Sequence, residues 1–163
     1  MPTIEEYATQ PRADRLQRLE RTSGELAAAI RGHSEAVLAR RPDGKNWAAK
    51  EVVCHLRDSE ELFMTRLEQV MAMDDPKFLG LNPDRWADER QYLRNDAGEA
   101  LGAFRKRRQE SLAFLQKLAP EEWRRGGIHV VRGRMTVDDF VTLMAWHDDN
   151  HFDQLKRAIE GRA

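Results

Sequence analysis

Two histidines near the end of the chain have the type and spacing of a metal site. His147 and His151 are four residues apart in a segment whose apolar residues recur every three or four positions. In a helix, side chains four apart lie on one face with Cβ atoms roughly 5–6 Å apart, so both imidazoles could reach one ion. A buried imidazole needs a polar partner, and one metal ion satisfies two. We therefore favour a metal over the alternative, two core histidines bonded to other polar groups.

A third ligand is needed, because two ligands rarely suffice to hold a catalytic ion. His55 is the best candidate, since it lies early in another amphipathic segment, at the rim of its apolar stripe. One end of a helix bundle would bring it towards the two later histidines. The sequence therefore predicts that His55, His147 and His151 bind one divalent metal ion.

Three neutral imidazoles leave open positions on such an ion, which is typical of a catalytic site. A bound water molecule would have its pKa lowered towards about 7, or a thiol cosubstrate could bind and ionise. The same site thus supports hydrolysis or thiol transfer on a small molecule. Imidazole ligands suit zinc, nickel, iron or copper, and we expect zinc or nickel.

Polar side chains on the same helix faces could orient the ligands. Gln154 follows His151 by three residues, Asp58 follows His55 by three, and Glu51 precedes it by four. Any of them could bond a ligand nitrogen, and either carboxylate could serve as a base. The alternative for both carboxylates is a charge pair with a neighbouring lysine or arginine.

Further residues could shape a pocket. Trp86 and Tyr92 lie in a long connecting stretch, where they would wall a substrate pocket or simply pack. His129 lies in a glycine-rich loop and would line the pocket or face solvent. His33 falls on an inward position of the first segment, where we expect a hydrogen-bonded core histidine rather than a ligand.

The run from residue 147 to residue 151 also resembles the His-Glu-x-x-His motif of zincin peptidases. Asp148 stands where that motif has the glutamate that acts as general base, and it is one methylene shorter. This difference argues against a zincin.

Composition excludes several classes of function. The chain has 163 residues, and we expect a single domain spanning residues 1–163. With 27 basic and 28 acidic side chains it lacks the basic excess typical of nucleic-acid binding. We expect no signal peptide and no membrane span, since no apolar stretch is long enough. A lone cysteine, Cys54, fits a reducing compartment, so we expect a cytoplasmic protein.

Four long segments have the apolar periodicity of amphipathic helices, separated by breaks rich in proline, glycine and aspartate. Thr136 and Asp139 form a capping-box-like start to the last one. The segments span 13–40, 48–73, 96–118 and from Thr136 to about Glu160. This pattern predicts an all-α four-helix bundle.

Two connecting stretches complete the prediction. Residues 77–95, between the second and third helices, form a connection that is long for a bundle and that we expect to carry function or to pack as a lid. Residues 128–132 have weak strand character, but we expect no sheet, because the stretch is short and isolated.

Three blocks of the sequence resemble the DinB/YfiT-like metalloenzyme superfamily. The first, Asn46–Leu56, has a tryptophan at a helix start followed by the first histidine. The second, Trp123–Val137, contains His129, Gly133 and Thr136. The third is the closing pattern His147-Asp148-x-x-His151-x-x-Gln154. The blocks occur in the family's order, and the resemblance runs from the first helix to Gln154.

The resemblance implies an up-down-down-up four-helix bundle, a three-histidine metal site and, frequently, a homodimer. Similar proteins include thiol-dependent transferases and isomerases, hydrolases and proteins of unknown activity. We therefore expect a metal-dependent hydrolase or a transferase that uses a low-molecular-weight thiol. The alternatives are a non-catalytic metal-binding stress-response module and a helical interaction domain without metal.

Overall fold

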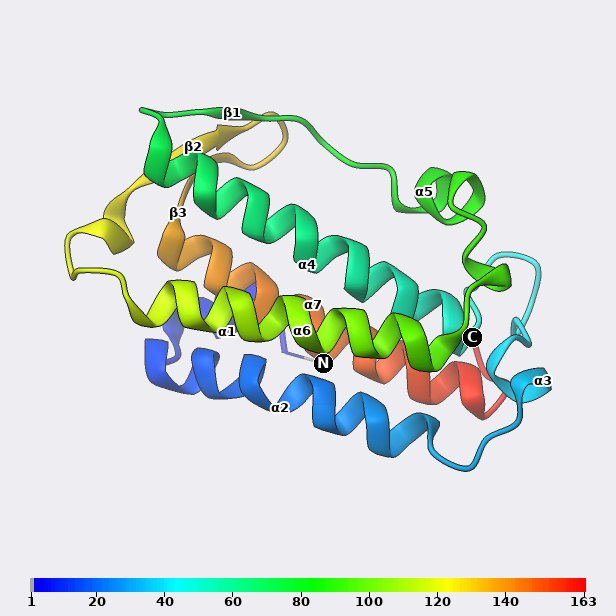
Figure 1. Ribbon diagram of the computed structural model, residues 1–163. Helices are drawn as coiled ribbons and strands as arrows, with labels where there is room; N and C mark the ends of the chain where they lie inside the picture. Colours follow the sequence, from blue (N-terminus) through cyan, green and yellow to red (C-terminus); the bar gives the residue numbers. More distant parts are fainter. Residues whose placement is uncertain (1) are drawn as a thin grey trace.

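Four long helices form the body of the molecule (Figure 1). Each packs against two others: α2 and α4 both contact α6 and α7. The computed structural model describes residues 2–163. The four helices are α2 (Arg12–Ile30), α4 (Ala49–Ala72), α6 (Ala97–Gln116) and α7 (Val137–Ile159). A helical bundle is therefore confirmed, and three of its four long helices lie within a few residues of their predicted bounds.

Shorter elements fill the connections. The additional α-helices are α1 (Ile4–Thr9), α3 (Glu35–Leu38) and α5 (Pro83–Glu89). The single-turn 3₁₀ helices are η1 (Tyr92–Arg94) and η2 (Glu122–Arg124), and the strands are β1 (Lys77–Phe78), β2 (Gly126–His129) and β3 (Gly133–Thr136). Among the described residues 2–163, no helix is both long enough and apolar enough to cross a membrane.

The first predicted helix is shorter than expected. It ends at Ile30, and Gly32 follows with φ +78°, a left-handed conformation that glycine adopts without steric cost. Ser34 then caps α3 by accepting a hydrogen bond from the Val37 amide. His33, which was expected to point inward, lies in this turn and is exposed, so it is not part of the core.

A small sheet exists where none was expected, which makes the all-α prediction wrong in this detail. β2 pairs antiparallel with β3 and parallel with β1, which comes from the long connection some 50 residues earlier. The two glycines that open β2 permit this close approach, because a Cβ at Gly127 would overlap the buried Phe78 ring. Residues 128–132 looked isolated because the partner strand β1 lies far away in the sequence, although it is adjacent in space.

The long connection after α4 runs back along the bundle (Figure 1). Lys50, at the start of α4, donates to the Leu93 carbonyl just before α6 at 3.3 Å. Both helices therefore begin at the same end of the bundle. The connection is ordered as β1, α5 and η1 on the way, and the Tyr92 side chain is fully buried.

The core consists of two clusters of apolar side chains stacked along the bundle. One gathers around Val52, Leu56 and Phe104, and the other around Phe140 and Met144. Helix α7 contributes to both and begins at the predicted cap, where Thr136 and Asp139 exchange hydrogen bonds. His55 lies on α4, and His147 and His151 lie on α7, between residues of these two clusters.

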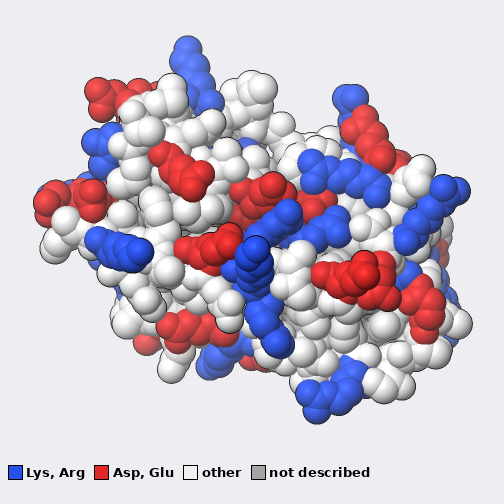
Figure 2. All heavy atoms as spheres, viewed as in Figure 1, with Lys and Arg blue, Asp and Glu red and all other residues white. Residues whose placement is uncertain are grey.

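Basic and acidic side chains alternate over one face of the molecule (Figure 2). Figure 2 shows lysine and arginine interspersed with aspartate and glutamate on one face, with no large region of a single sign. This distribution agrees with the formal net charge of -1.

Candidate metal centre

The three predicted ligand histidines meet between two neighbouring helices. His55 comes from α4, and His147 and His151 come from α7 one turn apart. One nitrogen from each ring lies within 4.8 Å of the others, and His55 Nε2 is 3.0 Å from His147 Nε2. Two nitrogens bound to one ion at about 2.0–2.1 Å are roughly 3.3 Å apart in a tetrahedral site. The cluster therefore has the dimensions of a metal centre.

All three imidazoles are held in the neutral form that a metal requires. Burial lowers the pKa of His55 to about 3, and the nearby His151 adds to this. Burial and the other two histidines also hold the pKa of His147 well below its usual value, and burial lowers that of His151. At neutral pH each ring thus offers a lone pair.

One buried nitrogen of the cluster has no protein partner. His55 Nδ1 is buried and makes no hydrogen bond within residues 2–163, whereas its Nε2 lies 3.3 Å from Ser59 Oγ. Leaving a buried polar atom unsatisfied is costly. An ion bound at His55 Nε2 would leave Nδ1 without a partner, so the fit to a metal rests on the other atoms: three neutral imidazole nitrogens form a donor set that suits a divalent ion of the zinc or nickel type.

Gln154 orients one of the rings. Its Oε1 lies 2.8 Å from His151 Nδ1. An amide oxygen can only accept, so Nδ1 carries the proton and Nε2 keeps its lone pair for a ligand. Trp47 stacks on the same ring, with centroids 6.2 Å apart and planes inclined by 14°. The bond between Gln154 and His151 is the type of contact that their three-residue spacing suggested.

The two carboxylates considered as bases have other partners. Glu51 accepts from the Ala48 amide and from two nitrogens of Arg41. Asp58 accepts from Tyr92 Oη at 2.8 Å and from the guanidinium groups of two arginines. Neither hydrogen-bonds a histidine, so the alternative of charge pairing describes both, although both are buried rather than on the surface.

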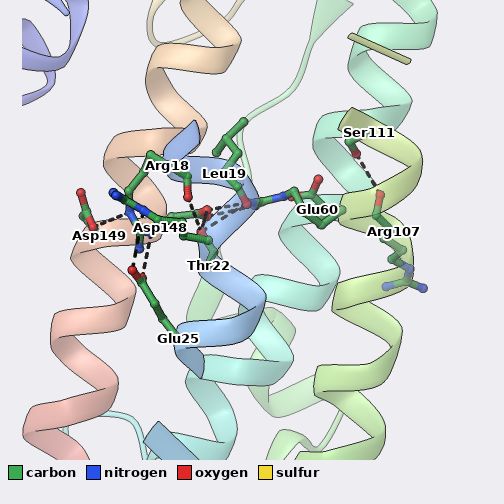
Figure 3. Close-up of polar contacts among 11 residues, drawn as sticks. Arg18, Leu19, Thr22, Glu25, Glu60, Arg107, Ser111, Asp148 and Asp149 are labelled. Atoms are coloured by element: carbon green, nitrogen blue, oxygen red, sulfur yellow. Dashed lines mark hydrogen bonds and ion pairs between the residues drawn. The ribbon is translucent and has the colours of Figure 1, made fainter. Parts of the chain in front are cut away.

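Asp148, the residue at the zincin base position, faces away from the histidine cluster. It is fully buried and forms ion pairs with Arg108, which also pairs with Glu60 at 2.7 Å. Figure 3 shows Asp148 and Glu60 in this network, together with Thr22, which also donates to Asp148. Asp148 is therefore poorly placed to act as a zincin base, because its carboxylate is buried in an ion pair with Arg108.

Sequence reasoning did not single out Arg108, which lies in the basic run Arg105–Arg108. Yet Leu101, Phe104, Arg108 and Leu115 follow the helical repeat of the inward face of α6. A charge on that face is a signal for a buried partner, because burying an unpaired charge costs several kcal/mol, on the order of 3–5 when a partner is removed.

A cavity of about 650 Å³ opens beside the histidines. Side chains from α4, α7, the long connection and the β2–β3 turn line it, and all three histidines form part of its wall. His129 also lines it, as one of its two interpretations predicted. Ser59, Arg66 and Arg132 line it as well, and sequence reasoning named none of these three.

His129 is held in a defined tautomer. Its Nδ1 accepts from the amides of Val131 at 3.1 Å and Arg132 at 3.3 Å. Burial, followed by the positive charges of Arg66 and Arg132, lowers its pKa, so the ring is neutral and its proton resides on Nε2. The residue is therefore a hydrogen-bond donor on the cavity wall.

Trp86 does not line this cavity. It lines a neighbouring hollow between α4 and the connection, and the guanidinium of Arg90 lies 3.9 Å from its ring centroid. The packing interpretation, rather than the pocket-wall interpretation, describes its position. The same holds for Tyr92, which is buried and bonded to Asp58.

Comparison with known proteins finds a matching family and a similar protein. The family model of the DinB superfamily matches residues 18–155. A protein of Oceanobacillus iheyensis named "Putative metal-dependent hydrolase OB0413" is 20% identical over 149 residues, which cover 91% of this chain and 85% of that protein.

A solved structure has the same fold. It is described as "YfiT from Bacillus subtilis is a probable metal-dependent hydrolase with an unusual four-helix bundle topology". The two superpose with a TM-score of 0.85 at 19% sequence identity, over 93% of this chain and 89% of that one. At this identity the likeness establishes the fold.

Proposed function

The chain belongs to the DinB superfamily, and on that premise we propose that it is a metal-dependent hydrolase of a small molecule. His55, His147 and His151 are its ligands for one divalent ion. The observation that supports this is the convergence of three neutral imidazoles on the wall of an open cavity. The names of two similar proteins, both of which refer to metal-dependent hydrolases, point the same way.

A divalent ion in this position would polarise a substrate and lower the pKa of a water molecule. The chain's own residues prepare the site for it. Gln154 holds His151 with Nε2 free for the ion. His129 offers an N–H that could bind an oxygen of the substrate on which negative charge develops.

Zinc or nickel is the ion we propose, because three imidazole nitrogens suit both. Elemental analysis of the purified chain, followed by reconstitution with each ion, identifies it. Hydrolysis of small esters and amides, measured with and without each ion, then tests the reaction.

The central test is the His147→Ala variant. It should lose its bound ion and its hydrolytic activity while keeping the helical circular dichroism of the wild type. His33→Ala removes an exposed histidine outside the cluster and serves as the matched control. Unchanged metal content in His147→Ala would refute the assignment of the ligands.

Finer features stay proposals. Transfer of a low-molecular-weight thiol is the alternative reaction, and an assay in which such a thiol is consumed only with an electrophilic cosubstrate separates it from hydrolysis. We also propose a homodimer and the up-down-down-up order, which the family resemblance implies, and a cytoplasmic location, which the lone cysteine favours. We propose that Glu51 and Asp58 position α4 and the long connection rather than transfer protons.

A further inference from the structure

The lining of the cavity carries positive charge and no negative charge. Arg66 and Arg132 both line the cavity, and none of its lining residues is an aspartate or a glutamate. On the face shown in Figure 2, by contrast, the two signs alternate. Within residues 2–163, neither of these two arginines forms an ion pair with a carboxylate.

Arg66 is unusual among the buried arginines. Its side chain is almost fully enclosed, with 7% of the residue exposed. The other enclosed arginines, Arg15, Arg18 and Arg108, each pair with at least one carboxylate. A buried charge without a counter-ion is unfavourable, and burial accordingly lowers the pKa of Arg66. The protein therefore maintains an uncompensated guanidinium at the edge of the cavity.

The Arg66 side chain is fixed in place rather than free to turn to solvent. Its Nη2 donates to the Leu79 carbonyl at 2.7 Å, and its Cζ lies 5.6 Å from the centroid of the Phe78 ring. One bond to a neutral carbonyl uses one of five N–H donors. The remaining donors have no acceptor among the described side chains that would neutralise the charge.

Arg132 and His129 extend the positive region. Arg132 is exposed in the turn between β2 and β3, at the cavity edge, and its charge reaches both His129 and His147, whose pKa values it lowers in addition to burial. With the Nε2 proton of His129, the region offers two cations and one neutral donor. Planar guanidinium groups bind carboxylates and phosphates through paired hydrogen bonds.

The remainder of the cavity suits an apolar group. Its lining also includes Leu62, Phe63, Leu81, Leu143 and Trp146. A ligand that fills the space must therefore combine an apolar body with an acidic end.

We propose that the cavity binds an acidic substrate, a carboxylate or phosphate with an apolar body, whose anionic group lies against Arg66 and Arg132 while its body extends to the histidines. This assignment of substrate class rests on the proposed function. It concerns Arg66 and Arg132 rather than the metal ligands, so the two proposals can be tested separately.

The test uses three probes of similar shape: phenylbutyrate, phenylpropylphosphonate and the neutral phenylbutanamide. Calorimetry measures their binding to the full chain, both zinc-loaded and after removal of metal by a chelator. At least one acid should bind about tenfold or more tightly than the amide in both forms, since a charge-assisted hydrogen bond is lost with the amide. The metal-free form separates the arginines from direct binding of an acid to the ion.

Substitutions then locate the effect. Arg66→Gln and Arg132→Gln should each reduce the preference for acids to about threefold or less, while Arg66→Lys retains part of it. Arg85→Gln, which removes an exposed arginine of α5 outside the cavity, should leave the preference unchanged. Thermal unfolding reports whether Arg66→Gln is folded. If it is not, the preference for acids measured with Arg132→Gln and Arg66→Lys decides between the outcomes.

Two outcomes would overturn the proposal: equal or undetectable binding of acids and amide, or a preference that both cavity variants retain in full. Metal content is measured on the same samples. Protein that prefers acids but binds no metal would refute the proposed function and keep this inference. Protein that binds metal without preferring acids would refute only this inference.

Discussion

At the scale of single residues, one amide determines how the last histidine of the cluster faces. Gln154 accepts from His151 Nδ1 and leaves Nε2 with its lone pair. Gln154→Leu removes the acceptor while preserving the size of the side chain. We expect metal affinity to fall about 10–100-fold, as is usual when an outer partner of a ligand is lost. Competition with a chromogenic chelator measures it.

Gln17→Leu, at an exposed position of α2, is the control for this change and should bind metal like the wild type. If Gln154→Leu also bound metal with wild-type affinity, the ring orientation would not depend on the amide.

The sequence predicted some residues of the site far better than others. His147, His151 and Gln154 share one helix, so their spacing alone places them on one face. Asp148 is adjacent to His147 in sequence, yet a step of one residue turns the side chain by about 100° towards a different neighbour. Its partner Arg108 lies on another helix, and only packing could reveal the pair. Arg66 was missed because an arginine on an amphipathic helix ordinarily faces solvent.

At the scale of elements, the contact between β1 and β2 depends on the absence of a side chain. A Cβ at Gly127 would overlap the Phe78 ring and the Pro76 carbonyl oxygen. Gly127→Ala should therefore destabilise the protein by about 1–3 kcal/mol, the usual cost of forcing atoms into a packed site. The midpoint of urea unfolding measures this change.

The chain offers a matched substitution with the opposite sign. Gly102 lies within α6 and is exposed, and a Cβ at this position would meet no neighbouring atom within 4 Å. Gly102→Ala should stabilise the protein by about 0.5–1 kcal/mol, because alanine restricts the unfolded chain and favours helix. Destabilisation by both substitutions to the same extent would contradict the steric argument for Gly127.

Elements formed by local periodicity were predicted, and those formed by distant pairing were not. Helices α4, α6 and α7 repeat their apolar residues along one face, and this pattern is visible within a single segment. The sheet joins residues 77–78 to 126–129 and 133–136, so neither its strands nor its order can be recognised from one stretch. Helix α2 ends at Ile30 because the chain turns at Gly32. The apolar periodicity continues beyond this turn, so the sequence predicted a longer helix.

At the scale of the whole molecule, one arginine connects all four long helices. Arg108 of α6 donates to the Leu19 carbonyl of α2, to Glu60 of α4 and to Asp148 of α7. Arg108→Met leaves two buried carboxylates without their counter-ion. We expect a loss of about 3–5 kcal/mol in the free energy of unfolding, measured with urea.

A partly exposed ion pair provides the comparison for Arg108. Arg157 pairs with Asp153 one turn away near the end of α7. Arg157→Met should lower the free energy of unfolding by about 0.5 kcal/mol or less. An Arg108→Met variant as stable as Arg157→Met would show that the network contributes little to stability.

Stability of the whole molecule should also fall in acid. Partial burial tends to raise the pKa of Asp138, but hydrogen bonds and charges of Arg12 and Arg15 outweigh it, so the pKa is lowered on folding. Its contribution is fully present above the unfolded-state pKa of about 3.9 and is lost as pH falls through the lower folded-state value. Burial likewise tends to raise the pKa of Asp58, but hydrogen bonds from Arg57, Arg90 and Tyr92 lower it. The contribution of Asp58 to stability should therefore be lost in the same direction of pH.

Asp138→Asn should therefore be less stable than the wild type at neutral pH and should lose less stability below about pH 4. Urea unfolding across this range measures both effects. Asp74→Asn alters a fully exposed carboxylate and should follow the wild-type curve. A wild-type stability that did not change on acidification would contradict the assignment.

The cavity is built from two kinds of chain segment. Helices α4 and α7 contribute the three histidines, whereas the stretch from Gly80 to Pro83 and residues 129–132 contribute other parts of the lining. These short stretches lie outside the long helices that carry the three imidazoles. Exchange of the stretch from Gly80 to Pro83 would therefore alter what the cavity accepts while His55, His147 and His151 stay in place.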